Sequence, residues 1–181
     1  MAVMEVRPAT AEDAAAIAAI YNAEVTSSTV TFDLVPRSLE EQVAWIEQRS
    51  GGHAALVVTD GGQVVGFGAL SPYRDRPAYT TSVEDSVYVH RDHRGRGVGR
   101  LVLAGLVETA RHHGFHTVFA RIVGGHEASI RLHQQAGFAI IGTEREVGRK
   151  LGRWLDVVVM QLLLDGNNEG APPGRPPVLE S

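Results

Sequence analysis

The chain has 181 residues, no cysteine and a formal net charge of −4, from 21 acidic and 17 basic side chains. Its length fits one domain with a substantial core, and the lack of cysteine excludes disulfides, thiolate zinc sites and a cysteine nucleophile. The acidic balance argues against a nucleic-acid-binding protein. No apolar run approaches the ~20 residues of a membrane span, and the N-terminus lacks the apolar core of a signal peptide. We therefore expect a soluble cytoplasmic protein with neither a nucleic-acid nor a membrane partner.

Local signals predict the elements along the chain. Ser38 and Glu41 form a capping box that opens a helix. Asp60-Gly61-Gly62 has the chemistry of a tight hairpin turn, and Gly114 is a natural helix C-cap. In chain order we expect a strand at 5–7, a helix at 11–24, a helix after 38, strands at 54–59, 63–70 and 82–89, a helix at 97–113, a strand at 116–123, a helix at 127–136, and a hairpin of strands at 138–147 and 154–164.

The order βααβββαβαββ indicates an α/β (α+β) fold, a mixed central sheet of about seven strands with helices on both faces. We expect one domain over residues 1–164. Residues 165–181 are polar and rich in proline and glycine, which predicts a disordered C-terminal tail.

A glycine-rich turn joins the strand at 82–89 to the helix at 97–113. Glycines allow close approach of a ligand to the backbone, and the first free N–H groups of the helix can cradle a pyrophosphate. The P-loop pattern fails because Arg100 follows Gly99, and the glycine spacing does not fit the dinucleotide fingerprint. The pattern that fits is Arg/Gln-x-x-Gly-x-Gly/Ala, satisfied by Arg94, Gly97 and Gly99.

With this turn and this element order, residues 4–164 resemble the GNAT superfamily of N-acetyltransferases, whose members bind the pyrophosphate of acetyl-coenzyme A there. Four further motifs are similar to those of the phosphinothricin and methionine sulfoximine acetyltransferase branch. They are Tyr73-Arg-Asp-Arg-Pro-Ala-Tyr79, Ser82-Val-Glu-Asp-Ser-Val-Tyr-Val89, Ser129-Ile-Arg-Leu-His133 and Gly152-Arg-Trp-Leu-Asp-Val157.

The resemblance implies two catalytic residues, Glu84 and His133. Glu84 would be the general base, directly or through a water, because burial beside the cofactor turn raises a carboxyl pKa toward the working range. From the residues alone, Glu84 could equally be a solvated strand residue or a salt-bridge partner. Its neighbour Asp85 points to the opposite face of the sheet. His133 would protonate the leaving thiolate, and the alternative is a plain surface histidine.

The resemblance also implies the acetyl-coenzyme A contacts. The Val89 N–H would bind the oxyanion. His126 stands where the family has asparagine, so the corresponding hydrogen bond is either kept by an imidazole nitrogen or lost. The implied cofactor-binding residues are Val87, Tyr88, Val89, Arg94, Gly95, Arg96, Gly97, Val98, Gly99, His126 and Ser129.

On the acceptor side, arginine forks suit a carboxylate or phosphinate-type oxyanion. The implied substrate-binding residues are Tyr73, Arg74, Arg76, Tyr79 and Val83. Residues 149–154 in the last hairpin would help to close the pocket across a homodimer interface. The eight histidines do not form a three-ligand set, so we expect no metal.

We therefore expect an enzyme that acetylates the α-amine of a small amino-acid analogue, such as phosphinothricin or methionine sulfoximine, by direct transfer. One alternative is the same chemistry on another amine, namely a natural amino acid, a polyamine or a protein N-terminus. The other is an acyl-CoA-binding module without turnover.

Overall fold

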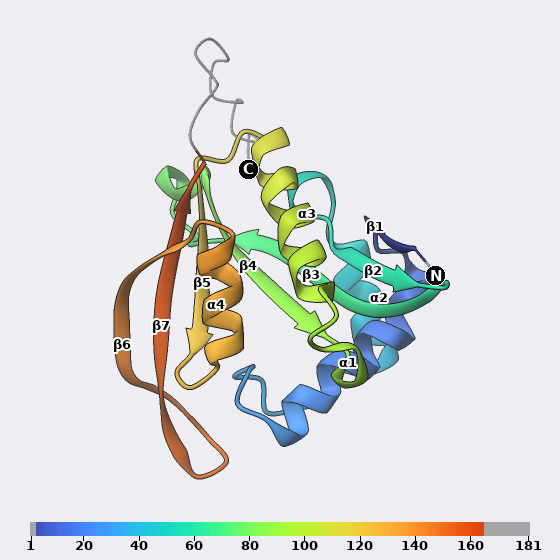
Figure 1. Cartoon of the computed structure of the whole chain (residues 1–181), viewed down its shortest axis with the longest axis horizontal. Helices are drawn as coiled ribbons and strands as arrows, with labels where there is room; N and C mark the ends of the chain where they lie inside the picture. Colours follow the sequence, from blue (N-terminus) through green and yellow to red (C-terminus); the bar gives the residue numbers. More distant parts are fainter. Residues whose placement is uncertain (1–2, 165–181) are drawn as a thin grey trace, which may run out of the picture.

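Seven strands form one mixed sheet in the order β1-β2-β3-β4-β5-β7-β6 (Figure 1). The computed structural model describes residues 3–164. The fold class and the element order are those expected from the sequence, whereas the tail at 165–181 lies outside the described residues. The strands are β1 (Met4–Pro8), β2 (Leu56–Asp60), β3 (Gln63–Pro72), β4 (Ser82–Val89), β5 (Thr117–Val123), β6 (Ala139–Lys150) and β7 (Arg153–Leu163), and the helices are α1 (Ala14–Ser27), α2 (Leu39–Glu47), α3 (Val98–His112) and α4 (Glu127–Gln135).

Most element ends lie where local chemistry places them. The Ser38 side chain accepts a hydrogen bond from the Glu41 N–H at 3.1 Å, which confirms the capping box of α2. In the last hairpin, strand pairing extends closer to the turn than in the strands expected at 138–147 and 154–164, because it continues as far as Lys150 and Arg153. The turn is only Leu151 and Gly152, both of which have positive φ, as a two-residue hairpin turn of this hand requires.

Helices cover both faces of the sheet and enclose two apolar cores. α3 and α4 lie over one face, and α1 and α2 lie over the other (Figure 1). The larger core packs α3 against alternate side chains of the central strands, and the smaller packs α1 and α2 against β2 and β3. Within residues 3–164, no helix is long and apolar enough to cross a membrane.

The central strands β4 and β5 separate soon after they meet. They pair in parallel only from Ser82–Thr117 to Glu84–Phe119, whereas β4 pairs with β3 as far as Val89. The His90 N–H donates to the Val65 carbonyl of β3 at 2.9 Å. Because successive N–H groups of a strand point to opposite edges, the Val89 N–H faces the open edge toward β5. Peptide groups on that edge are free to bond a ligand.

Candidate active site

Two pockets meet where β4 and β5 separate. The larger pocket has a volume of about 600 Å³ and lies against the N-terminal end of α3. The smaller pocket, of about 300 Å³, contains Glu84. Both are lined by the open edge of β4 and by the start of α4, so a molecule in one can reach the other. The shared lining residues are Val30, Val87, Tyr88, His126 and Ser129.

The glycine-rich turn forms one wall of the larger pocket. Gly95 and Gly97 have φ values of 73° and 86°, a backbone conformation that glycine adopts without a steric penalty. Gly97 caps α3, so the unbonded N–H groups of the first turn point toward the pocket. Four arginines add positive charge, and they are Arg91, Arg94, Arg100 and Arg131.

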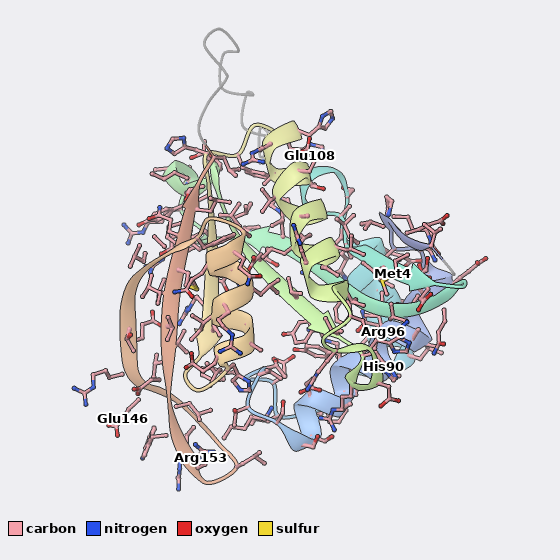
Figure 2. The ribbon with its side chains drawn as sticks, in the orientation of Figure 1. Met4, His90, Arg96, Glu108, Glu146 and Arg153 are labelled. Carbon is pink, nitrogen blue, oxygen red and sulfur yellow. The ribbon has the colours of Figure 1, made fainter. Side chains whose placement is uncertain are left out.

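All but one of the expected cofactor-binding residues line this larger pocket. The exception is Arg96, whose guanidinium pairs with Asp60 at 3.0 Å. Figure 2 labels Arg96 and His90 on the segment that links β4 to α3. The structure therefore places Arg96 outside the pocket wall, although it belongs to the same turn.

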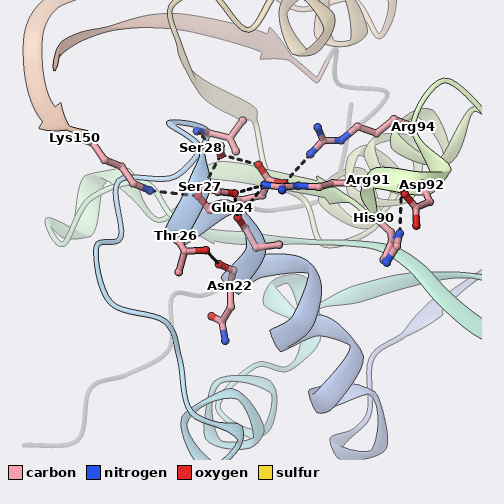
Figure 3. Close-up of polar contacts among 12 residues, drawn as sticks. Asn22, Glu24, Thr26, Ser27, Ser28, His90, Arg91, Asp92, Arg94 and Lys150 are labelled. Atoms are coloured by element: carbon pink, nitrogen blue, oxygen red, sulfur yellow. Dashed lines mark hydrogen bonds and ion pairs between the residues drawn. The ribbon is translucent and has the colours of Figure 1, made fainter. Parts of the chain in front are cut away.

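Glu24 at the end of α1 is a buried carboxylate that the sequence analysis did not single out as functional. It accepts hydrogen bonds from Arg91 Nε at 2.9 Å, Arg94 Nη2 at 2.8 Å and Ser28 Oγ at 2.6 Å (Figure 3). Burial alone would raise the pKa of Glu24, but these bonds and charges outweigh it and the pKa is lowered. The sequence did contain a signal for Glu24, because this charged residue lies on the apolar face of the helix.

Contacts from distant elements hold the segment at 28–38 over both pockets. The Thr29 hydroxyl meets His126 Nε2 at 3.1 Å, and burial lowers the pKa of His126, which favours the neutral ring. The Lys150 ammonium, on the last hairpin, donates to the Thr31 carbonyl at 2.7 Å. In Figure 3, Lys150 approaches this segment from the side opposite Arg94.

Glu84 lines the smaller pocket from β4. Burial raises the pKa of its carboxyl above the ordinary value, and the nearby Arg121 opposes that shift. Arg121 on β5 is a second residue that the sequence analysis missed. Its signal in the sequence was one charged residue within the otherwise uncharged strand Thr117–Val123.

Asp85 and His133 form a buried pair beside this pocket. His133 Nε2 lies 3.1 Å from Asp85 Oδ2, and each side chain is 3% exposed. His133 Nδ1 lies 2.8 Å from the Ser129 carbonyl, which only accepts, so Nδ1 carries a hydrogen. Burial lowers the pKa of His133, but the bond to Asp85 and its charge outweigh burial, so the pKa is raised. The pair therefore favours an imidazolium that faces a carboxylate.

The expected substrate-binding residues lie outside the lining of both pockets. Tyr73 stacks on Phe119 with ring centroids 4.1 Å apart, and Phe119 pairs with Glu84 in the sheet. Arg74 lies over the rings of Tyr73 and Tyr79, at 5.0 and 5.9 Å. Phe119 thus links this group to Glu84. Arg74 and Arg76 are both exposed, whereas Val83 is fully buried in the core.

The family model described as "Acetyltransferase (GNAT) domain" matches residues 6–159 of the chain. The chain belongs to the GNAT acetyltransferase family.

Several similar members of the GNAT family carry names that state what they acetylate. The chain is 39% identical over 167 residues to the L-amino acid N-acyltransferase MnaT of Escherichia coli, covering 92% of this chain and 97% of that protein. It is 41% identical over 162 residues to an L-methionine sulfoximine/L-methionine sulfone acetyltransferase of Pseudomonas aeruginosa, covering 88% and 94%. A phosphinothricin acetyltransferase of Sinorhizobium meliloti, solved in complex with AcCoA, superposes with a TM-score of 0.88 at 34% identity and covers 96% of each chain.

Within the part of this GNAT chain that the structure describes, His, Asp and Glu side chains do not gather in groups of three that could hold a metal ion.

Proposed function

We propose that the chain transfers the acetyl group of acetyl-coenzyme A directly to the α-amine of a small anionic amino acid of the phosphinothricin or methionine sulfoximine type. One observation carries this proposal. The pocket with Glu84 joins the pocket at the α3 N-terminus along the open edge of β4. The names of the relatives support the same chemistry.

The larger pocket suits a coenzyme A molecule. Its arginines and the free N–H groups of α3 match a pyrophosphate. The open edge of β4 offers peptide groups that an extended amide chain can bond as an added strand does. We therefore assign coenzyme A binding to the residues expected from the sequence. Arg96 would contribute indirectly, because its ion pair with Asp60 anchors the glycine-rich turn.

Acetyl-coenzyme A supplies the acetyl thioester when bound. Glu84 accepts a proton from the acceptor ammonium, directly or through a water, and its raised pKa suits that task. The Val89 N–H donates to the carbonyl oxygen as negative charge develops there. The amine nitrogen would bond to the carbonyl carbon as the carbon–sulfur bond breaks. The sulfur would leave as the coenzyme A thiolate, and the second proton lost from the nitrogen would balance the proton that this thiolate gains. Because the chain has no cysteine, we favour this direct transfer over an acyl-cysteine route.

His133 as the acid that protonates the leaving thiolate stays a prediction. Its Nε2 proton is directed at Asp85 and its Nδ1 proton at the Ser129 carbonyl, so delivery requires the Asp85 contact to open. The cytoplasmic location and the absence of a metal also stay predictions.

We also propose that the enzyme is a homodimer. The last hairpin extends beyond the rest of the molecule, as the positions of Glu146 and Arg153 illustrate (Figure 2). Trp154 is 61% exposed, with Arg149 5.5 Å from its ring. An apolar surface of this kind favours a partner, and light scattering of the purified chain tests for a second copy. The exposed apolar side chains of the hairpin are those of Ile140, Ile141, Val147, Leu151, Trp154 and Leu163.

The test of the proposed function is an acceptor panel assayed by release of coenzyme A. The chain contains no cysteine, so a thiol reagent detects only the released coenzyme. We expect the highest kcat/KM with L-phosphinothricin or L-methionine sulfoximine, compared with common amino acids, spermidine and a peptide with a free N-terminus. Activity confined to the peptide or to spermidine would contradict the proposal. Acetyl-coenzyme A binding without turnover of any amine would instead indicate a binding module.

A further inference from the structure

Arg121 is the available cation of the smaller pocket. Three lining residues of this pocket, within the described chain, can carry positive charge: Arg121, His126 and His133. Burial lowers the pKa of His126, which favours its neutral form, and His133 is committed to Asp85. Arg121 alone therefore remains to receive an anionic group from a molecule in this pocket.

The sheet register places Arg121 near Glu84. Glu84 on β4 is the register partner of Phe119 on β5, and Arg121 follows Phe119 by two residues on the same face. The advance along the strand is about 7 Å, at roughly 3.3 Å per residue. Both side chains line the same pocket. This spacing suits the two charged ends of one amino acid, with its ammonium at Glu84 and its carboxylate at Arg121.

Arg121 already has a carboxylate partner, Glu144 on β6. The two side chains are 37% and 38% exposed, and such solvated pairs add little to stability. The contact engages Arg121 Nη2, and a guanidinium has five N–H donors, so further donors remain for a second carboxylate. Glu144 therefore competes with a bound anion without blocking it.

The loop arginines are less well placed. Arg74 lies over the rings of Tyr73 and Tyr79, and neither Arg74 nor Arg76 lines the pocket.

We propose that Arg121 binds the α-carboxylate of the amine acceptor, and that Glu144 weakens this binding by competing for the same guanidinium. This inference rests on the proposed acetyl transfer at Glu84. It adds a residue that determines specificity for amines with a neighbouring carboxylate.

The experiment compares Arg121→Met with the wild type on L-methionine sulfoximine and on its α-methyl ester. The ester keeps the amine and the sulfoximine but lacks the carboxylate charge. We expect kcat/KM for the free acid to fall about 10- to 100-fold, the value of a charge-assisted bond, and kcat/KM for the ester to change less than about threefold. The ratio of the two acceptors cancels any general effect of Arg121 on the Glu84 base.

Glu144→Gln gives the opposite prediction. Removing the competing charge should lower KM for the free acid about two- to fivefold and leave the ester unchanged. Arg145→Met is the matched control, because Arg145 is an exposed neighbour on β6 that does not line the pocket. Arg145→Met should leave both acceptors as in the wild type.

Equal losses for acid and ester in Arg121→Met, or no loss for either, would overturn the assignment of Arg121. A wild-type enzyme that binds methionine sulfoximine without releasing coenzyme A would refute the proposed function instead. In that case calorimetry still decides the role of Arg121. Weaker binding of the acid by Arg121→Met supports it, and equal binding overturns it. A wild type that binds neither form overturns both proposals.

Discussion

Replacing Asp85 by asparagine should destabilise the protein because it leaves His133 without its charged partner. The two side chains meet at 3.1 Å and each is 3% exposed. Breaking a buried ion pair on one side costs about 3–5 kcal/mol, which for a domain of this size lowers Tm by about 6–20 °C. In Asp85→Asn, burial is no longer offset by the carboxylate, so the His133 pKa should fall.

The penalty should depend on pH. A group whose pKa is raised by folding adds stability that is fully present below its unfolded pKa, about 6.5 for histidine, and is lost as pH rises through the folded value. Urea denaturation of wild type and Asp85→Asn at pH 6 and pH 9 measures this. We expect the larger difference in unfolding free energy at pH 6.

Asp75→Asn is the matched control, because Asp75 is exposed on the loop between β3 and β4. It should change the unfolding free energy by less than about 0.5 kcal/mol at either pH. A penalty for Asp85→Asn below about 1 kcal/mol at pH 6, or an equal penalty at both pH values, would show that the pair does not hold a stabilising imidazolium.

Three further predictions concern the pockets. Glu84→Gln should lower kcat about 10²- to 10⁴-fold, because the general base is lost. In the wild type, kcat/KM should fall on the acid side of the pH profile through a pKa above 4.5, because burial raises the pKa of the Glu84 carboxyl. Glu24→Ala should lower the free energy of unfolding, measured by urea denaturation, by about 1–3 kcal/mol, because the hydrogen bonds of Glu24 to Arg91, Arg94 and Ser28 are lost. This penalty should shrink as pH falls through the lowered pKa of Glu24, where the wild type loses the same stabilisation. In Gly148→Val, the new Cβ would lie 2.5 Å from the ring of Phe32, which lines the smaller pocket, so the ring must move. Steady-state kinetics should therefore show a larger rise in KM for the acceptor than in KM for acetyl-coenzyme A.

The sequence by itself determined the features that depend on near neighbours. The capping box at Ser38 and the glycines at 95 and 97 act through bonds and dihedral angles within a few residues, so their patterns can be recognised without the fold. The same holds for the order of the elements. The motif around Glu84 was also local, which is why the resemblance could single out this residue, and the structure places Glu84 in a pocket.

Only the tertiary structure decided which distant charges meet. Glu24 and Arg94 are 70 residues apart, and Asp85 and His133 are 48 apart. Arg121 reaches the pocket of Glu84 because β4 and β5 pair in one register and then diverge. Register and divergence follow from packing the whole sheet between two layers of helices, and no short segment of sequence contains that information.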